Sequence, residues 1–285
     1  MDQLTTVNEI DAVSLEAISK LTQMYLQEAS MLLGTISDYS ALVSKGMKSL
    51  ALPRFAGFVV EDKVAATKLT MQTSPADSDI LLLNKHKGIG VEIEDIAELQ
   101  SNVDLMKEYA LRMSKDLAYK IDQDIADCLD NASASAPDHR LAFDNGTSFT
   151  KADFTKAKKL LKKQNVPTND LSNLFLGISP ELEEDILNLS DFVDADKYLS
   201  GSEQIKLNGV IGRLYGFNVV VSNAFSDDRA LFYHRTHVAY ATQQAPKFEI
   251  GREIKSLADI AALSSIYGCQ YLDNGVRAVE IGSAT

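Results

Sequence analysis

The segment Ser101–Asn131, SNVDLMKEYALRMSKDLAYKIDQDIADCLDN, decides how this chain of 285 residues is organised. Ser101 and Asp104 stand at the spacing of a capping box, which marks the beginning of a helix. Apolar side chains then recur at three- and four-residue steps and predict one buried stripe: Met106, Ala110, Met113, Leu117, Ile121, Ile125 and Leu129. The pattern ends before ASASAP, a loop-like run at 132–137. We predict a helix of about 30 residues, roughly 45 Å long, which indicates a structural spine.

Upstream of this helix, two extended segments predict a long antiparallel hairpin. Apolar and polar residues alternate within 59–72 and again within 80–94. The polar run between them, TSPADSD at 73–79, is rich in turn-forming residues and is predicted as the tip. A ribbon of this length is marginally stable alone and exposes two unpaired edges. We therefore expect it to lie on a neighbouring subunit.

The residues before the hairpin predict a helix, a turn and a short strand. Ser14 is a suitable N-cap, and apolar residues follow it at helical spacing as far as Leu32. Gly34 is a suitable residue to end this helix. Gly46 is predicted in a turn before a short strand, and Pro53 indicates that this strand lies at the edge of a sheet or ends there. The segment is too short to be a domain. Its apolar face must therefore pack on the rest of the chain or on a neighbour.

After the spine helix, 135–228 has the pattern of an α/β insertion. One helix is predicted to begin with a cap formed by Thr150 and Asp153. Another begins with Ser179 as its N-cap, followed by a proline in the first turn. The helices are predicted at 150–163 and 179–188, and short buried strands at 173–178 and 217–222.

From Ala230 onward the chain returns to extended patterns, seen in ALFYH, HVAYAT, KFEIGREI and RAVEI. We expect these strands to pair with the base of the hairpin in 54–94. The C-terminal strands would then complete a domain that 135–228 interrupts. The chain thus predicts two domains, one inserted into the other.

The composition indicates a folded, soluble chain and disfavours several classes of protein. Lys and Arg number 28 and Asp and Glu 40, so the formal net charge of −12 disfavours nucleic acid as the main partner. Hydrophobic residues make up 45% and charged residues 24%, as in ordinary globular proteins. No apolar run approaches the roughly 20 residues of a membrane helix, and no export signal is visible.

The motifs that usually carry chemistry are absent from the sequence. Gly209, Gly212 and Gly216 match neither dinucleotide-binding nor phosphate-loop spacing and favour a tight approach into a strand. Ser179 lacks the second glycine of a nucleophile elbow, so a helix cap explains it better. We predict no catalytic residue, no cofactor and no metal, and we expect a protein that is not an enzyme.

Four groups of reactive or charged residues have structural explanations. The histidines lack metal-ligand spacing and are expected at the surface or half-buried: His86, His139, His234 and His237. Two acidic clusters could bind a hard cation but lack a calcium-loop pattern: Asp77 and Asp79, and Asp122, Asp124, Asp127 and Asp130. The second cluster, on the predicted helix, is expected as a solvated face. The cysteines form no C-x-x-C pair and are expected as buried thiols: Cys128 and Cys269. A basic helix face is expected in solvent, with an acidic neighbour or nucleic acid as the alternative contact: Lys151, Lys156, Lys158, Lys159, Lys162 and Lys163.

Several longer motifs accompany this uncommon order of hairpin, long helix, insertion and closing strands. LEAISKLTQMYLQEASML is followed by KGMKSLALPRF, and GVIGRLYGFNVVVSNAF lies at 209–225. ALFYHRTHVAYATQQAP and SSIYGCQYLDNGVRAVEI close the chain. Together these motifs resemble the major capsid proteins of tailed bacteriophages, which have the Hong Kong 97-type fold.

The resemblance implies an α+β fold, the Hong Kong 97-like capsid fold, in which each part has a place. An N-terminal arm is implied at 1–53 and an extended hairpin loop at 54–94. The spine helix and a peripheral domain are implied at 95–134 and 229–285, and an inserted axial domain at 135–228.

The resemblance also implies a function. The protein would be a major capsid protein that self-assembles into hexamers and pentamers of an icosahedral shell around the phage genome. It would be located in the virion after assembly in the host cytoplasm. Its expected partners are further copies of itself, a scaffolding protein, a portal protein and packaged DNA that it contacts without tight binding; no membrane is implied. The family's occasional Lys–Asn crosslink has no assignable counterpart among the hairpin lysines: Lys63, Lys68, Lys85 and Lys87.

Two alternatives remain open at this point. An encapsulin-like nanocompartment shell protein would share the same fold. A metal-dependent hydrolase would use the acidic cluster near Asp122 to bind its metal.

Overall fold

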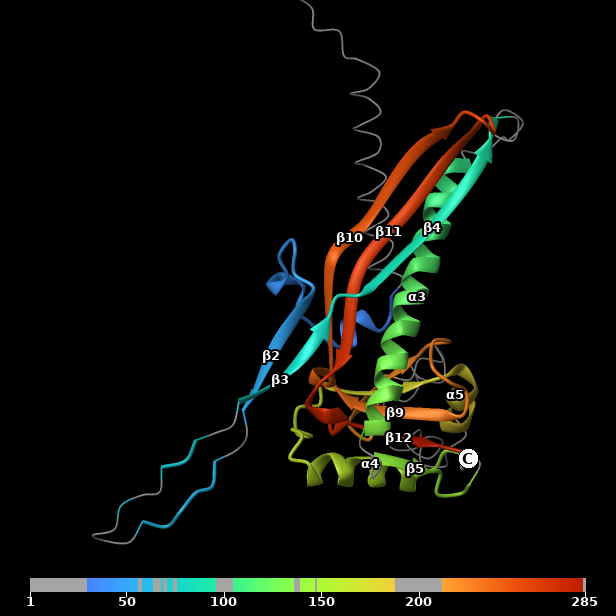
Figure 1. Ribbon diagram of the computed structural model, residues 1–285. Coiled ribbons are helices and arrows are strands. Elements are labelled where there is room, and N and C mark those ends of the chain that lie inside the picture. Colours follow the sequence, from blue (N-terminus) through green and yellow to red (C-terminus); the bar gives the residue numbers. More distant parts are fainter. Residues whose placement is uncertain are drawn as a thin grey trace, which may run out of the picture.

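The computed structural model describes residues 30–55, 58–63, 68, 71–73, 76–95, 105–135, 139–146, 148–187 and 212–283. Within them, a long helix runs from one sheet to another, and a two-stranded ribbon projects from the side (Figure 1). Residues 14–29 of the predicted first helix, the Ser101 cap and Gly209 lie outside the described residues. The predicted end of that helix is wrong, because 30–32 are not helical and Gly34 lies within a short 3-10 helix, Leu33–Thr35. In the described part, no helix is long and apolar enough to cross a membrane.

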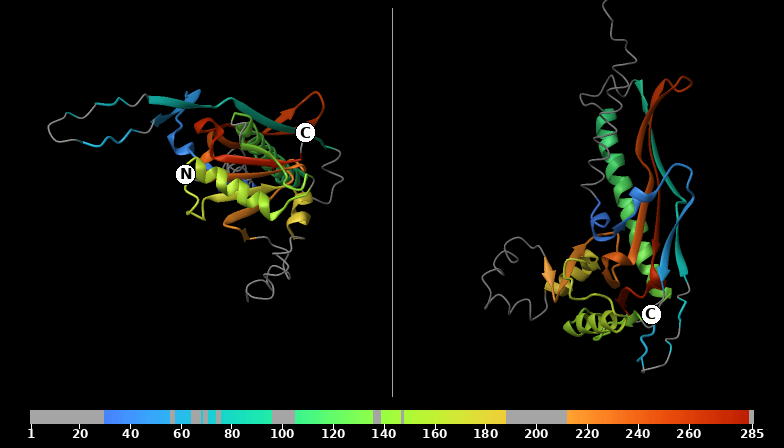
Figure 2. Two further views of the ribbon diagram at one scale, coloured as in Figure 1. Left: turned by 90° about the horizontal axis from the view of Figure 1, so that it is seen from below. Right: turned by 90° about the vertical axis from the view of Figure 1, so that its left-hand side faces the viewer.

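The predicted spine helix is confirmed as α3 (Leu105–Ser135). Six members of the predicted apolar stripe are 4% exposed or less, and Met106 packs against the same core. The stripe is buried because α3 lies along one face of a four-stranded sheet and reaches the second sheet at its far end (Figure 2). The helix continues four residues past the predicted end at Asn131.

The sheet along α3 has the strand order β1-β10-β11-β4. Strands β10 and β11 form a long antiparallel pair, and β4 pairs antiparallel with β11, from Tyr267 opposite Lys85 to Ala258 opposite Glu94. The bounds are Ser37–Asp38 for β1, Val238–Glu253 for β10, Ala258–Tyr271 for β11 and Lys85–Glu94 for β4. The C-terminal strands β10 and β11 thus join the segment before α3, as expected.

The position predicted for the hairpin tip is wrong. Strand β2 (Ser49–Phe55) pairs antiparallel with β3 (Ala76–Leu82), so 76–79 lies in a strand and 85–94 belongs to another sheet. Val59 and Gln72, farther out, are opposite each other in the same register. The Val59 N–H donates to the Gln72 side-chain oxygen at 2.9 Å, and the Gln72 side-chain nitrogen donates to the Val59 carbonyl oxygen at 2.7 Å. The error arises because the first half of β3 contains the polar residues Asp77, Ser78 and Asp79, which are equally typical of a turn.

Pro53 lies inside β2 and does not end it. In this two-stranded ribbon, β2 pairs with β3 on one side only and is therefore an edge strand. Proline is tolerated in an edge strand because its missing backbone N–H need not remove a hydrogen bond of the sheet.

The second sheet has the strand order β5-β12-β9-β6-β8-β7. The bounds are Arg140–Ala142 for β5, Ala278–Gly282 for β12, Arg229–His234 for β9, Leu174–Ile178 for β6, Phe217–Val221 for β8 and Arg213–Leu214 for β7. The helices α4 (Lys151–Lys163) and α5 (Pro180–Leu187) pack against this sheet in a shared apolar core. The predicted Thr150–Asp153 capping box is present, and the Leu182 N–H donates to Ser179 Oγ at 3.5 Å.

The expectation that all C-terminal strands pair with the hairpin base is wrong for β9 and β12. Strand β9 pairs with β6 of the insertion, and β12 pairs with β9 and β5. Alternate residues of β9 enter two different cores: Leu231 and Tyr233 face α3, whereas Ala230 and Phe232 face the core that contains α4. A strand that is buried on both faces needs a strand on each side and a packed layer on each face. The base of the hairpin packs on one face only and cannot supply this environment.

Replacement of Ile125 by alanine should strongly destabilise the protein. Ile125 is 0% exposed in the core beneath α3, so Ile125→Ala should lower the free energy of unfolding by about 2–5 kcal/mol. Urea denaturation measures this change. The exposed Lys115→Ala on the same helix should change it by less than about 0.5 kcal/mol. A similar loss for both variants would contradict the burial of this stripe.

Candidate functional site

The root of the projecting ribbon, formed by β2 and β3, is anchored in a small apolar core. Leu50 of β2 and Leu81 of β3 are 9% and 0% exposed, and they pack with Ala239 and Ala241 of β10. The ribbon passes so close to β11 that a Cβ added to Gly268 would lie 2.1 Å from the Leu82 carbonyl oxygen. The contact therefore requires glycine at 268, which lies in the closing motif SSIYGCQYLDNGVRAVEI.

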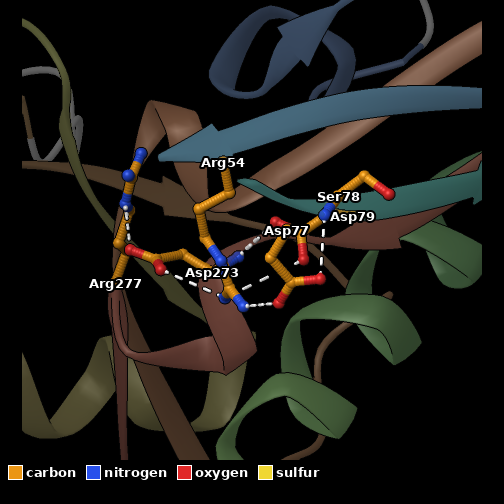
Figure 3. Close-up of polar contacts among 6 residues, drawn as sticks. All are labelled: Arg54, Asp77, Ser78, Asp79, Asp273 and Arg277. Carbon is orange, nitrogen blue, oxygen red and sulfur yellow. Dashed lines mark hydrogen bonds and ion pairs between the residues drawn. The ribbon is translucent and has the colours of Figure 1, made fainter. Parts of the chain in front are cut away.

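A network of ion pairs ties the same root to the loop before β12 (Figure 3). The Arg54 guanidinium donates a hydrogen bond to the Asp77 carboxylate across the ribbon and another, of 3.4 Å, to Asp273. The Asp273 N–H donates to Asp79 at 2.9 Å, and Arg277 Nε donates to the Asp273 carboxylate at 3.2 Å. The Ser78 N–H and then Arg54 lower the pKa of Asp77 below its usual range. Two arginines and three aspartates thus connect the ribbon to the loop before β12.

Sequence reasoning missed this network. The sequence patterns do not single out Arg54, and they place Asp77 and Asp79 at the polar tip of the hairpin. The four-residue spacing of Asp273 and Arg277 was a usable signal for one ion pair. The contact of Arg54 with Asp77 depends on the register of β2 with β3, which local pattern does not reveal.

The acidic residues of α3 are not all on a solvated face, so this expectation is wrong for Asp122 and Asp124. Asp122 is 3% exposed and accepts hydrogen bonds from the Ser30 hydroxyl and the N–H groups of Met31 and Leu32. Burial raises its pKa. Asp127 is exposed as expected, and Asp130 is half-buried beside Arg229.

Asp124 is 5% exposed and accepts a 2.7 Å hydrogen bond from the Tyr267 hydroxyl. Lys85, Lys87 and Lys120 lie 3.5–3.7 Å from its carboxylate oxygens. Burial opposes the charge, but the bond from Tyr267 and the three ammonium groups hold the pKa of Asp124 below its usual range. Among the described residues, no group of three or more acidic, histidine or cysteine side chains could hold a metal ion.

The histidines also differ from expectation. His86 is exposed, as expected. His139, His234 and His237 are 2%, 5% and 0% exposed, so the expectation of surface or half-buried positions is wrong for these three. His139 Nδ1 lies 2.7 Å from the Ala278 carbonyl oxygen, and both ring nitrogens of His237 lack a hydrogen-bond partner among the described residues. Burial, then Arg277 and the two neighbouring histidines, lower the pKa of His237 to about 3.

The remaining predicted residues occupy separate places. Lys63 and Lys68 are exposed on the ribbon, and Gly216 takes a φ of 95° in the turn between β7 and β8. The α4 lysines divide into exposed members (Lys151, Lys159, Lys162 and Lys163) and two half-buried ones, of which Lys156 pairs with Asp144 and Lys158 donates to the Tyr215 carbonyl. Cys128 and Cys269 are half-buried and buried thiols in contact with each other.

The outer part of the ribbon exposes large apolar side chains. We define the outer ribbon as residues 58–63, 68 and 71–73. Phe58 and Val59 are 66% and 71% exposed, and Val60 and Met71 are 94% and 95% exposed. Such a concentration of exposed apolar surface marks a site of association.

A protein-family model described as phage capsid protein matches residues 79–263. The chain belongs to the phage capsid protein family. None of the curated protein sequences is significantly similar to this capsid protein. Its fold is similar to that of a structure from Mycobacterium phage Che8, with 23% identity and a TM-score of 0.72 over 88% of this chain and 90% of that chain.

Two further structures share the fold of the capsid protein. The capsid of cyanophage P-SCSP1u has 17% identity and a TM-score of 0.71 over 90% of this chain and 88% of that chain. The mature capsid of bacteriophage PhiM1 has 12% identity and a TM-score of 0.67 over 89% and 86%. The predicted α+β capsid fold and the assignment as a tailed-phage major capsid protein are confirmed, and the protein is a structural component of the virion shell.

Loss of Arg54 should loosen the ribbon without unfolding the capsid protein. In Arg54→Ala, the carboxylates of Asp77, Asp79 and Asp273 lose their shared cation and repel one another. Backbone amides of β2 and β3 should therefore exchange with deuterium several-fold faster, while those of α3 keep the wild-type rate. The matched control is Arg112→Ala, which removes a local ion pair with Asp116 on the helix surface. Unchanged exchange in β2 and β3 of Arg54→Ala would contradict the anchoring role.

The burial of His237 should make the protein sensitive to acid. The unfolded chain takes up a proton near pH 6.5, whereas folded His237 stays neutral down to about pH 3. The free energy of unfolding therefore does not depend on His237 protonation above pH 6.5. Below pH 6.5 the uptake of a proton by the unfolded chain lowers it by about 1.4 kcal/mol per pH unit. Urea denaturation between pH 7.5 and 5 should show a shallower loss of stability in His237→Gln than in the wild type. The exposed-site control His86→Gln should follow the wild type, and parallel curves for all three proteins would refute the assignment.

Proposed function

We propose that the capsid protein forms hexamers and pentamers of an icosahedral shell by laying its outer ribbon on the neighbouring subunit. The observation that carries this proposal is the near-complete exposure of Val60 and Met71 on a ribbon whose root is firmly anchored. Exposed apolar side chains on a projecting arm gain free energy when a second surface covers them. Contact between an arm and a different patch of the next subunit is heterologous, and such contacts form rings when the rotation between neighbours closes.

The two sheets suggest a revised division into domains. We assign the four-stranded sheet and α3 to the peripheral domain. We assign the six-stranded sheet with α4 and α5 to the axial domain. This assignment moves β9 and β12 from the expected peripheral segment 229–285 into the axial domain, because they pair with strands of the insertion.

The same proposal includes the expected partners and location. Assembly in the host cytoplasm with a scaffolding protein and a portal protein accords with membership of the phage capsid family. The net charge of −12 suits a shell that encloses DNA without binding it tightly. The exposed lysines of α4 are the part of the described surface best suited to such a contact.

We propose a structural role without enzymatic activity. The hydrolase alternative requires Asp122 to be available to a metal, but its carboxylate is buried and accepts hydrogen bonds from Ser30 and Met31. An encapsulin-like shell is not favoured, since the matching family and the three solved structures described above are those of phages.

Removal of the outer ribbon should abolish assembly but not folding. Deletion of 58–73 leaves 56, 57, 74 and 75 to connect β2 with β3, a loop length common in hairpins, and spares the buried Leu81. The variant should keep the wild-type circular dichroism and melting temperature, yet sediment without rings or shells. Electron microscopy and sedimentation velocity measure the outcome. Normal shells from this variant would overturn the proposal.

Point variants separate apolar contact from ribbon length. The double variant Val60→Ser, Met71→Ser should raise the protein concentration needed for assembly at least tenfold, because each buried apolar side chain contributes about 1.5–3 kcal/mol. The matched control Glu61→Ser, Asp62→Ser alters exposed polar positions of the same segment and should assemble at nearly the wild-type concentration. Equal effects of the two double variants would contradict apolar burial at this contact.

A further inference from the structure

The two cysteines of the chain meet where the spine helix packs on the four-stranded sheet. Cys128 lies on α3 and Cys269 on β11, 141 positions apart in sequence. Their sulfur atoms are 2.8 Å apart. Cys128 Sγ also lies 3.4 Å from the Cys269 carbonyl oxygen, and Cys269 Sγ lies 3.3 Å from the Asp124 carbonyl oxygen. Both side chains are therefore held against each other by the packing of two different elements.

The electrostatic surroundings make the two thiols unequal. The hydrogen bond from Cys128 lowers the pKa of Cys269, and the Lys85 ammonium group on β4 lowers it further. The hydrogen bond to Cys269 and burial raise the pKa of Cys128. The neighbouring Lys85 ammonium group thus makes Cys269 the more readily ionised sulfur, and Cys128 lies beside it. This division matches the roles of an attacking and a resolving cysteine.

We propose that Cys128 and Cys269 form an oxidative modification site at which a small peroxide converts the two thiols to an intramolecular disulfide between α3 and β11. The Cys269 thiolate attacks one peroxide oxygen, the O–O bond breaks, and Cys269 becomes a sulfenic acid while hydroxide leaves and takes a proton to become water. The Cys128 sulfur then attacks the Cys269 sulfur and breaks its S–O bond. The leaving hydroxide takes the Cys128 proton as a second water molecule, so two thiols and one hydrogen peroxide yield one disulfide and two water molecules.

A bond at this position would join parts of the chain that are distant in sequence. The closed loop from 128 to 269 contains β5, α4, β6, α5, β7, β8, β9 and β10. A crosslink around so long a loop restricts the unfolded chain and stabilises the folded one. In a shell, the bond would form once the particle leaves the reducing host cell, and this consequence alone rests on the proposed function.

The chemistry can be tested on the unassembled full-length protein. Reduced wild type treated with millimolar hydrogen peroxide should fall from two free thiols to none in a denaturing thiol assay, and its intact mass should fall by about 2 Da. Its melting temperature should rise by about 5 °C or more, and dithiothreitol should reverse the change. Two persistent thiols, sulfinic acids in place of the disulfide, or disulfides between chains would each overturn the proposal. Since the assay needs no shell, a failure of assembly leaves its result unaffected.

Variants assign the roles of the individual groups. Cys128→Ser should gain no thermal stability with peroxide and should leave a sulfenic acid at Cys269 that dimedone traps. Lys85→Met should form the disulfide several-fold more slowly at pH 7, because the thiolate loses its neighbouring cation. The matched control Lys115→Met, on the exposed face of α3, should react at the wild-type rate. Equal rates of disulfide formation in the two lysine variants would overturn the role of Lys85. If dimedone traps a sulfenic acid at Cys128 in Cys269→Ser as fast as it traps one at Cys269 in Cys128→Ser, the assignment of Cys269 as the attacking sulfur would be overturned.

Discussion

The burial of one face of α3 is the constraint on which the rest of the structure depends. Its apolar stripe shares a single core with β10 and β11 of one sheet and with residues of β9 and β12 of the other. Because both sheets use the same helix to exclude water, their relative position is determined by packing and not by the loops between them. A rigid frame of this kind gives the projecting ribbon a defined direction (Figure 1).

The ribbon combines two opposed properties. At its root, Leu81 is buried and Arg54 connects strands of the ribbon to Asp273 of the body. In its outer part, the apolar side chains are exposed. An anchored root limits the conformational entropy that the arm loses on binding, and the exposed apolar surface supplies the favourable free energy of contact. The arrangement suits a capsid protein, in which many modest contacts must form in one orientation.

Two acidic residues of the spine helix, Asp122 and Asp124, are buried and serve packing. Asp122 accepts hydrogen bonds from N–H groups of the segment that precedes β1. Asp124 accepts a hydrogen bond from Tyr267 and forms ion pairs with lysines of β4 and α3. Each buried carboxylate is compensated by hydrogen bonds or cations, as burial of a charge requires. The excess negative charge of the chain is therefore carried by other residues, whereas these two aspartates hold neighbouring elements against α3.

Features that depend on neighbours a few residues away could be predicted from the amino-acid sequence alone. The helical period of α3, the Thr150–Asp153 capping box of α4 and the Ser179 cap of α5 are local, and the order of the elements sufficed to indicate the capsid fold. Strand pairing, the burial of His237 and the meeting of Cys128 with Cys269 depend on residues distant in the chain, so only the tertiary structure decided them. Alternation of apolar and polar residues marks a strand, but it contains no information about the partner, because side chains alternate in the same way in every register.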